Sequence, residues 1–575
     1  MTNHDLAAIF DHIGTLLELK GENRFKFQAY QRAARAIDHY PLPMAQLAAA
    51  DRLNEVPGIG EAISEKIREL LQSGRLRFYD TLRAEFPPGL VAVMDIPGVG
   101  PKLAGRFWKE LGIESVEDLE QALAEGRVAA LPRLGARSAE NIQRSIEALR
   151  QRDQRLPIGA ALSLAVSLCG DLRAAAPVTE VVPAGSVRRF RETVGNINLA
   201  CAAADPAAVV RAFVGLPAVD RVVMQGEDRA TVLVQSGVEV HLWVAREDAF
   251  GSLLQHLTGS GEHNIAVQER ARRLGLSVSE YGITDLATGA LTPCRTEEEV
   301  YRRLGLSAIP PEIREGGEEL EQAATGTLPR LVQPADLRGD LHAHTLASDG
   351  RSTLEEMVAA ARARGYAYLA ITDHSVGRAV ANGLSVARLR EHLAQIRALN
   401  ARLEGQFRIL AGSEVDIRAD GSLDYPDEVL AELDIVVASV HSAMGQDREK
   451  MTERVVKALC NPHVDVLGHP TARLLGSREP VQLDMERVFQ AALETGTALE
   501  INVSLPRLDL KDTHLRRAVE LGVPLVMSTD AHHTDQLAAM ETGVSHARRG
   551  WCTAHHILNT RPLPELLAWL HRHGA

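Results

Sequence analysis

The chain has 575 residues, of which 45% are hydrophobic and 24% are charged, and its formal net charge is −13. This length exceeds what one hydrophobic core supports, and the ordinary globular composition excludes a disordered or fibrous protein. There is no basic apolar leader and no uninterrupted apolar run of about 18 residues, so we expect a cytoplasmic protein without a membrane span.

The cysteines and the net charge limit the chemistry further. Five scattered cysteines without a C-x-x-C pair exclude a disulfide framework and a thiolate zinc site. Any metal must therefore bind histidine and carboxylate side chains. The negative net charge gives no whole-molecule attraction to nucleic acid, so DNA binding has to be argued from motifs.

The first 150 residues have apolar side chains at helical spacing and no strand-like alternation, which predicts an all-helical region. Two turns repeat in it, V-P-G-I-G-E-A-I from Val56 and I-P-G-V-G-P-K-L from Ile96, with a weaker copy from Leu131. Glycines before a helix allow positive φ and leave N–H groups free for a phosphate. One copy would equally fit a tight turn between packed helices, but two copies favour helix-hairpin-helix contacts with the DNA backbone. The predicted contact residues are Gly58, Gly60, Gly98, Gly100 and Lys102.

The first of these turns also resembles the lyase domain of DNA polymerase beta. Lys66 lies where that family has its Schiff-base lysine, and Lys26 and Tyr30 lie at other matching positions. Ala62 replaces a further family lysine. The resemblance makes Lys66 a candidate for lyase chemistry, whereas most lysines on helices are simply solvated.

Residues 151–325 mix β-rich apolar runs with helical patterns, which predicts an α+β segment. The stretch A-G-S-V-R-R-F-R-E-T-V-G-N-I-N-L-A, from Ala184 to Ala200, resembles the palm motif of family X DNA polymerases. The resemblance continues through Leu257 to Ile265, Ser279 to Ile283, Ile309 to Glu315 and on into the C-terminal third. Essentially the whole chain is thus similar to the bacterial PolX family, in which a family X polymerase is fused to a PHP domain.

The departure from that family lies at the polymerase chemistry. Asn196 and Asn198 stand where the family has two carboxylates, and His241 stands at the third position. Two-metal phosphoryl transfer uses anionic oxygens to hold two Mg²⁺ ions, so Mg²⁺ binding at this palm is doubtful. Ser186 and Arg189, which match triphosphate-contacting positions, are retained. We therefore expect polymerase activity to be lost or very weak, with the palm kept as a DNA-holding scaffold.

The C-terminal third alternates helical patterns with short apolar runs, which predicts a parallel barrel. The runs are Gly339 to His344, Tyr366 to His374, Arg408 to Asp416, Asp434 to His441, Val464 to His469, Ala498 to Val503 and Pro524 to His532. Almost every run ends in side chains that can bind a metal. Functional residues of such barrels gather at the C-terminal ends of the strands, so we expect one shared site.

This third resembles the PHP (polymerase and histidinol phosphatase) family, whose members hold up to three metals. The resemblance implies that one metal is held by the catalytic set His342, His344, Glu414 and Asp530. Glu414 would bridge to a second metal held by His441 and His469, and a third would be held by Asp349, His374 and His532. Mixed imidazole and carboxylate ligands suit Zn²⁺, Mn²⁺ or Fe²⁺ better than Mg²⁺. Arg378, Arg418 and His533 lie just beyond these runs and are candidates for phosphate contacts.

We therefore expect a multidomain chain. The expected parts are a helical lyase-like domain at 1–83, helix-hairpin-helix fingers at 84–150, an α+β nucleotidyltransferase palm at 151–255, a thumb at 256–325, a linker at 326–338 and a distorted (β/α)7 PHP barrel at 339–575. The function expected from the resemblance is a monomeric DNA repair enzyme on gapped, nicked or primer-template DNA. It would be a metal-dependent phosphodiesterase that acts as a 3′-5′ exonuclease. AP endonuclease or 3′-phosphatase activity would be additional activities of the same site. Two alternatives stay open, a bifunctional polymerase with 3′-5′ exonuclease and a histidinol-phosphatase-like phosphomonoesterase.

Overall fold

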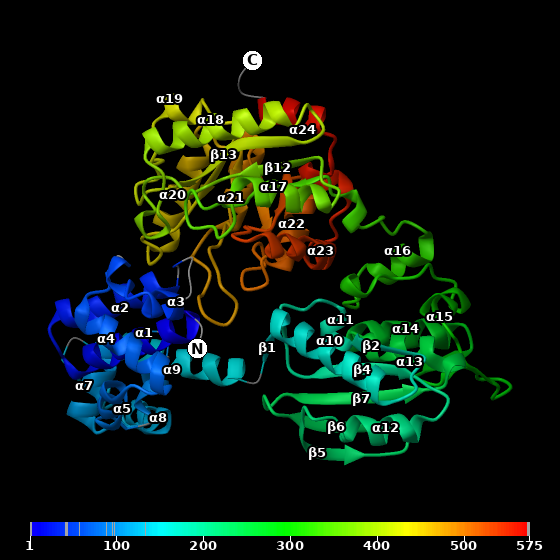
Figure 1. Cartoon of the computed structure of the whole chain (residues 1–575). Helices are drawn as coiled ribbons and strands as arrows, with labels where there is room; N and C mark the ends of the chain where they lie inside the picture. The colour runs from blue at the N-terminus through cyan, green and yellow to red at the C-terminus, as the bar shows by residue number, and fades with distance from the viewer. Residues whose placement is uncertain are drawn as a thin grey trace. The chain divides into compact units, whose positions relative to one another are not determined.

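The computed structural model describes residues 3–38, 40, 44–56, 58–87, 89–94, 96, 98–132, 134–153 and 155–571. The chain forms two compact units, Met1–Gln154 and Arg155–Ala575, which follow each other along the colour gradient of Figure 1. Pro57 and Pro97 of the two predicted turns lie outside the described residues.

The described part of the first unit is entirely helical, which confirms the prediction. Its helices are α1 (Asn3–Lys20), α2 (Arg24–Asp38), α3 (Met44–Ala49), α4 (Glu61–Ser73), α5 (Arg77–Ala84), α6 (Leu90–Met94), α7 (Pro101–Leu111), α8 (Val116–Ala124) and α9 (Ala136–Asp153), with a 3-10 turn at Leu53–Glu55. Phe10, Ile13 and Leu16, spaced three apart on α1, are fully buried and pack with Phe107 of α7 in one core. The helical spacing of apolar residues thus builds this core.

The second unit begins with a palm segment around a five-stranded sheet of order β2-β4-β7-β6-β5. The strands are β2 (Glu180–Ala184), β4 (Ile197–Ala202), β5 (Val219–Gln225), β6 (Arg229–Val234) and β7 (Glu239–Ala245), while β1 (Leu156–Pro157) pairs with β3 (Thr193–Val194). The helices are α10 (Ile158–Ala175), α11 (Gly185–Arg188) and α12 (Pro206–Val214). By length and composition alone α10 could cross a membrane, but Ile158, Leu168 and Leu172 are fully buried in the palm core.

A thumb segment follows the palm. It consists of α13 (Phe250–Thr258), α14 (Gly261–Arg273), a sheet of β8 (Leu276–Ser279), β9 (Gly282–Asp285) and β10 (Leu291–Thr292), then α15 (Glu297–Arg303) and α16 (Glu319–Thr325). Short 3-10 turns lie at Glu247–Ala249 and Pro311–Ile313. Its core contains a charged group: the fully buried Arg314 lies 2.5 Å from Glu297 Oε1. A buried guanidinium is tolerated because a carboxylate pairs with it.

The last part is a barrel of seven parallel strands hydrogen-bonded in chain order. These are β11 (Gly339–Asp340), β12 (Tyr368–Ile371), β13 (Arg408–Asp416), β14 (Ile435–Ser439), β15 (Val466–Leu467), β16 (Ala498–Asn502) and β17 (Leu525–Ser528). A parallel bridge between Ala343 and Ala531 joins the two ends of the sheet, so the barrel is nearly closed. This confirms the predicted (β/α)7 architecture.

Helices surround the barrel and close one of its ends. They are α17 (Leu354–Ala363), α18 (Val386–Arg402), α19 (Asp427–Leu430), α20 (Arg448–Leu459), α21 (Met485–Thr495), α22 (Asp512–Leu521), α23 (Ala539–Arg549) and α24 (Leu563–Leu570). Further 3-10 turns lie at Pro334–Asp336, Ala379–Ala381, Thr534–Ala538, Ala554–His556 and Leu558–Thr560. Leu566 and Leu570 of α24 pack into the inner core with Tyr368, which begins β12. This end is filled with apolar side chains, which leaves the C-terminal ends of the strands for polar groups.

The segment 326–338, predicted as a linker, packs against the barrel. Leu331 bridges to Thr553, and the backbone N–H of Val332 donates to the carbonyl of Cys552 at 2.9 Å. Both Leu331 and Val332 are buried. The thumb and the barrel are therefore joined by a fixed segment.

Candidate metal centre

The predicted ligands lie together at the C-terminal ends of the barrel strands. They come from six strands: His342 and His344 follow β11, His374 follows β12, Glu414 lies near the end of β13, His441 follows β14, His469 follows β15, and Asp530 and His532 follow β17. Asp349 comes from the loop between β11 and α17 and completes the set. His344 is central, since its ring centroid lies 4.5 Å from that of His374 and 4.2 Å from that of His532.

These side chains form three overlapping groups whose ligand atoms lie within 4.8 Å of one another. The groups are His342, His344, Glu414 and Asp530; His344, Asp349, His374 and His532; and His374, Glu414 and His441. His469 also points at the shared carboxylate, with Nε2 2.8 Å from Glu414 Oε1. Glu414 and His344 each belong to two groups, as expected for a cluster that holds more than one ion.

Two buried carboxylates that the sequence prediction missed orient the imidazoles. Glu500 Oε1 lies 2.7 Å from His342 Nδ1, and Asp416 Oδ1 lies 2.6 Å from His441 Nδ1. A histidine that donates from one ring nitrogen to a carboxylate presents the other nitrogen to a metal. Glu500 was detectable as an acid inside the apolar run A-L-E-I-N-V, where a charge is otherwise costly.

The loop that carries His344 and Asp349 is fixed by another missed acid, Asp373. Its carboxylate accepts hydrogen bonds from the Thr345 backbone N–H at 2.8 Å and hydroxyl at 2.7 Å, and from the Ser348 hydroxyl at 2.6 Å. The position of both ligands therefore depends on a side chain that does not itself join any of the ligand groups.

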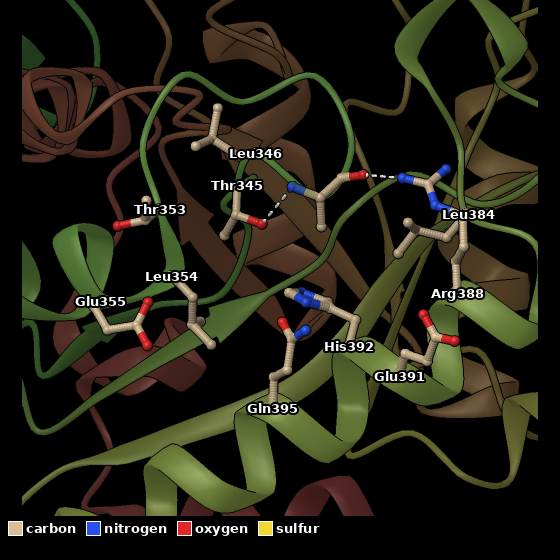
Figure 2. A pocket seen from close by; sticks show the side chains of 11 residues that line it. Thr345, Leu346, Thr353, Leu354, Glu355, Leu384, Arg388, Glu391, His392 and Gln395 are labelled. Carbon is tan, nitrogen blue, oxygen red and sulfur yellow. Dashed lines mark hydrogen bonds between the residues drawn. The ribbon is translucent and has the colours of Figure 1, made fainter.

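A cavity of about 380 Å³ lies beside this loop and is lined by residues of α17 and α18 (Figure 2). In it Arg388 donates to the carbonyl of Ala347 at 2.6 Å, and His392 Nε2 lies 2.9 Å from Asp373 Oδ2. No predicted metal ligand lines this cavity, so it is distinct from the ligand cluster.

Charge in the cluster is balanced between imidazoles and carboxylates. Burial and the neighbouring rings of His532 and His374 lower the pKa of His344 to about 4, so this ring is neutral. Burial opposes ionisation of Glu414, but the adjacent imidazoles, first among them His441, lower the pKa of this carboxyl well below its ordinary value. Neutral imidazole and ionised carboxylate are the forms that bind metals, and protons compete for the same atoms.

The residues present fit divalent metals. The Nε2 atom of His342 and the Nδ1 atom of His344 are buried without a hydrogen-bond partner among the described residues. Carboxylate oxygens of Glu414 and Asp349 lie at 3.4 Å and 3.9 Å from these nitrogens, close enough for an ion to join them. Unsatisfied buried nitrogens are costly, and a shared cation would satisfy them together with the carboxylates.

The candidates for phosphate contacts are placed differently. Arg378 is partly buried, with an Nε atom that has no partner among the described residues, whereas Arg418 is exposed and donates to the carbonyl of Asp424 at 3.3 Å. His533 is 42% exposed at its side chain and caps the 3-10 turn that follows it. Arg507, which sequence reasoning missed, lies 3.2 Å from Asp530 Oδ2 through its Nε.

In the palm, the side chains of Asn196, Asn198 and His241 also lie together. Asn198 of β4 is the register partner of His241 on β7. Asn196 Nδ2 lies 3.2 Å from His241 Nε2, and Asn198 Nδ2 donates to Asn196 Oδ1 at 3.2 Å. The other ring nitrogen, His241 Nδ1, lies 3.0 Å from the Thr231 hydroxyl. These amides and the imidazole satisfy one another by hydrogen bonds, and the carboxylate beside them, Glu239, lies 3.0 Å from His241 Nε2.

Ser186 and Arg189 of the palm differ in their partners. Ser186 lies on α11 and is partly exposed. Arg189 is 14% exposed at its side chain and donates to the carbonyl of Thr258 in the thumb. Arg189 is therefore engaged between palm and thumb.

The helical hairpins of the first unit have the predicted backbone. Gly58 and Gly98 adopt φ of +88° and +89°, and Gly60 and Gly100 are the N-terminal caps of α4 and α7. A Cβ atom at any of these glycines would meet nothing within 4 Å, so the turns present open backbone. Lys102 is exposed at the start of α7.

Lys66, the candidate lyase residue, lies on α4. Its Nζ donates to the carbonyl of Ala62 at 3.0 Å and stands 5.2 Å from the ring centroid of Phe78. Lys26, at another matching position, pairs with Glu22 at 2.9 Å.

Known families match four parts of this chain. A helix-hairpin-helix domain matches residues 1–76, and a SAM-like helix-hairpin-helix tandem matches residues 91–148. The DNA polymerase beta thumb matches residues 253–315, and the PHP domain matches residues 340–504. The matched ranges agree with the helical unit, the thumb segment and the greater part of the barrel.

Relatives of two kinds are similar to the chain. The DNA polymerase/3′-5′ exonuclease PolX of Bacillus subtilis (strain 168) is 38% identical over 574 residues, which is 100% of both chains. A protein named probable phosphatase from Thermoanaerobacter sp. (strain X514) is 31% identical over 233 residues, 38% of this chain and 89% of that protein. One of the same description from Shewanella sp. (strain ANA-3) is 32% identical over 245 residues, 41% of this chain and 92% of that protein.

Proposed function

The chain belongs to the PolX family, and we propose that it is a DNA repair enzyme whose barrel hydrolyses DNA phosphodiester bonds with two or three divalent metals. The observation that carries this proposal is the set of three overlapping ligand groups around Glu414 and His344. The Bacillus relative is named both a polymerase and a 3′-5′ exonuclease, and the ligand groups of the barrel support the exonuclease activity as our proposal for this chain.

The proposed ligands have distinct tasks. His342, His344, Glu414 and Asp530 would hold the first metal, and the remaining ligands, Asp349, His374, His441, His469 and His532, would hold the others. Metals bound in such sites orient a phosphate, lower the pKa of a bound water and stabilise the leaving oxygen. Glu500 and Asp416 hold the ring nitrogens of their histidines toward the cluster. Mixed nitrogen and oxygen ligands favour Mn²⁺, Zn²⁺ or Fe²⁺.

The same proposal assigns the other parts to DNA binding. The hairpin residues Gly58, Gly60, Gly98, Gly100 and Lys102 would contact DNA backbone phosphates on gapped, nicked or primer-template DNA. Asn196, Asn198 and His241 offer no anionic oxygen for Mg²⁺, so we propose that polymerisation is lost or very weak. We expect a monomer in the cytoplasm, and lyase chemistry at Lys66 stays a separate hypothesis.

The direct test compares two activities of the full-length protein on gapped DNA with Mn²⁺ or Mg²⁺. Wild type should shorten the strand from its 3′ end, and His344→Ala should abolish this by more than about 100-fold, because the central ligand of two groups is removed. Wild type should not extend a primer. Primer extension at a rate similar to degradation would instead support the bifunctional enzyme.

The phosphatase relatives favour a second candidate, a small-molecule phosphomonoesterase, because their similarity covers the barrel. Hydrolysis of a small phosphomonoester in the presence of gapped DNA separates the two. DNA should inhibit the reaction competitively if the barrel serves DNA. Unchanged hydrolysis at DNA concentrations that saturate binding would support the phosphomonoesterase.

A further inference from the structure

Arg507 is a partly buried cation beside the proposed metal site, with one donor that has no partner among the described residues. Its Nε lies 3.2 Å from Asp530 Oδ2, on the carboxylate whose Oδ1 lies 3.1 Å from His344 Nε2. The side chain is 19% exposed, and its Nη1 atom is buried without a hydrogen-bond partner among the described residues. Asp530 thus lies between the Arg507 guanidinium and the first ligand group. A guanidinium in this position with an unsatisfied donor can bind a phosphate oxygen.

Further guanidinium groups lie near Arg507. Burial, followed by the positive charges of Arg507 and Arg378, lowers the pKa of Arg478, and the carboxylate of Asp509 opposes this shift. Arg378 Nε is also without a partner among the described residues. Asp530 and Asp509 balance part of this positive charge, and unsatisfied guanidinium donors can still bind the oxygens of an anion. The neighbourhood therefore suits a phosphate group.

The loop that carries Arg507 is fastened at its tip to the palm segment. Leu508 is fully buried and belongs to the palm core together with Ile158. Leu505 packs against Gly159 of α10, where an added Cβ would lie 3.1 Å from the Leu505 Cβ. The apolar tip of this barrel loop is thus part of another segment's core.

An ion pair adds a polar fastening. Arg473 Nη2 lies 2.7 Å from Glu192 Oε1 of the palm, and both side chains are largely buried. The same guanidinium donates to the carbonyl of Leu508 and, through Nε, to the carbonyl of Arg507 at 3.1 Å. The Arg473 side chain therefore connects Glu192 of the palm to the backbone of Arg507.

The barrel holds this loop at its base and also near its tip, where the Leu475 N–H donates to the carbonyl of Pro506 at 2.6 Å. Asp509 N–H donates to the carbonyl of Asn502 at 3.1 Å, and Asp509 accepts from Thr471 N–H and hydroxyl, both at 2.9 Å. The contacts of Leu505 and Leu508 with the palm add to these barrel contacts on either side of Arg507.

We propose that Arg507 binds the reacting phosphate at the barrel site and that the palm acts as a positioning element for the Arg507 loop. The first part rests on the proposed phosphodiesterase function. The second gives the palm a role in hydrolysis that requires neither Mg²⁺ nor nucleotide at Asn196, Asn198 and His241.

The test uses the full-length protein with Mn²⁺ and a small phosphodiester, bis(p-nitrophenyl) phosphate, beside gapped DNA. Arg507→Ala should lower kcat/KM on both substrates by about 100-fold, since one preorganised donor to the phosphate is lost. Arg507→Lys should recover part of this loss, which a purely structural role would not predict. Bound Mn²⁺ per protein should be unchanged in both variants.

Glu192→Gln and, independently, Leu505→Ala test the positioning by the palm. Each should lower kcat on the small diester by about 10-fold, because a displaced contact group loses much of its effect. Bis(p-nitrophenyl) phosphate is too small to need the palm for binding, so this loss cannot come from weaker DNA binding. The matched control is Glu318→Gln, which removes the 3.1 Å pair of Glu318 with Arg516 of the barrel and does not touch the Arg507 loop.

The outcomes separate the proposals. If wild type does not hydrolyse the diester with any divalent metal, the proposed phosphodiesterase function fails. If wild type is active and Arg507→Ala retains full kcat/KM, the phosphate contact is overturned. If Arg507→Ala is impaired while Glu192→Gln and Leu505→Ala match Glu318→Gln, the palm does not position the loop. Thermal melting of each variant checks that an activity loss is not due to unfolding.

Discussion

Replacing Glu500 by glutamine tests how the barrel prepares its histidines for metal. Glu500 is fully buried, lies 2.7 Å from His342 Nδ1 through Oε1, and accepts from the amide of Asn502 at 3.3 Å through Oε2. Glutamine has nearly the same shape but no charge. Its amide presents either a weaker acceptor or a donor to His342, and a donor would shift the ring proton to Nε2, the atom that faces Glu414.

The expected size of the effect follows from the support that the carboxylate gives to two proposed ligands, the ring of His342 and the backbone N–H of His469. One oriented histidine of the first group is weakened, and carboxylates in this position contribute about 10- to 100-fold to metal affinity, or about 1.4 to 2.7 kcal/mol. Glu500→Gln should therefore need about 10- to 100-fold more Mn²⁺ for half-maximal strand degradation, with kcat largely recovered at saturating metal.

Activity measured across a Mn²⁺ titration, with bound metal determined in parallel, gives this number. The control is Glu494→Gln, the same change on the exposed face of α21, where Glu494 only accepts from Gln490 at 2.7 Å. The reasoning is refuted if Glu500→Gln binds Mn²⁺ as tightly as wild type, or if excess metal fails to recover its activity.

Four other outcomes are expected. Strand degradation should fall as pH drops below about 6, because protons compete with metal for the imidazoles, and added Mn²⁺ should shift the midpoint to lower pH; a midpoint independent of Mn²⁺ would contradict this. Burial opposes ionisation of Glu297, but Arg314 and Arg188 lower the pKa of this carboxyl to about 2. The ionised carboxylate therefore stabilises the fold by about 3 kcal/mol above pH 4.5, and this contribution is lost as pH falls toward 2. Urea unfolding at pH 7 and at pH 3 should therefore show Glu297→Gln losing more stability at pH 7. Gly98→Val should weaken binding to gapped DNA by about 10-fold in a fluorescence anisotropy titration, since valine is strained at φ of +89°, while hydrolysis of the small diester stays unchanged. Borohydride trapping on an abasic site should label wild type and not Lys66→Ala if lyase chemistry exists, and no labelling of wild type would remove that hypothesis.

Much of the architecture was predictable because it depends on local periodicity. Alternating apolar runs and helical patterns after residue 338 predicted a parallel barrel, and all seven strands lie within the predicted runs. The repeated turns at Gly58 and Gly98 predicted positive φ, which both residues adopt. These features could be predicted since each is fixed by residues close together in the chain.

The sequence predicted the proposed metal ligands of the candidate site, but it did not predict the residues that hold these ligands in place. His342, His344 and His441 follow strands, so barrel topology alone places them at one rim. In the sequence, Asp373 and Asp416 resembled ordinary acidic residues near strand ends. Arg507 resembled an ordinary arginine in a loop. The two acids act on partners that lie 25 to 28 residues away in the chain: Asp373 contacts Thr345 and Ser348, and Asp416 contacts His441. The role of Arg507 depends on the palm, which the Arg507 loop contacts.

By itself, the sequence determined the family and the order of the parts, and it predicted the proposed metal ligands and a palm without carboxylates at Asn196, Asn198 and His241. These follow from residue identity and spacing along the chain. Only the tertiary structure decided that Glu500 and Asp416 hold the histidine rings, and that the tip of the Arg507 loop is buried in the palm core. The reason is physical: a hydrogen bond or a packed leucine depends on which surfaces meet after folding, and residues far apart in sequence carry no local signal of that contact.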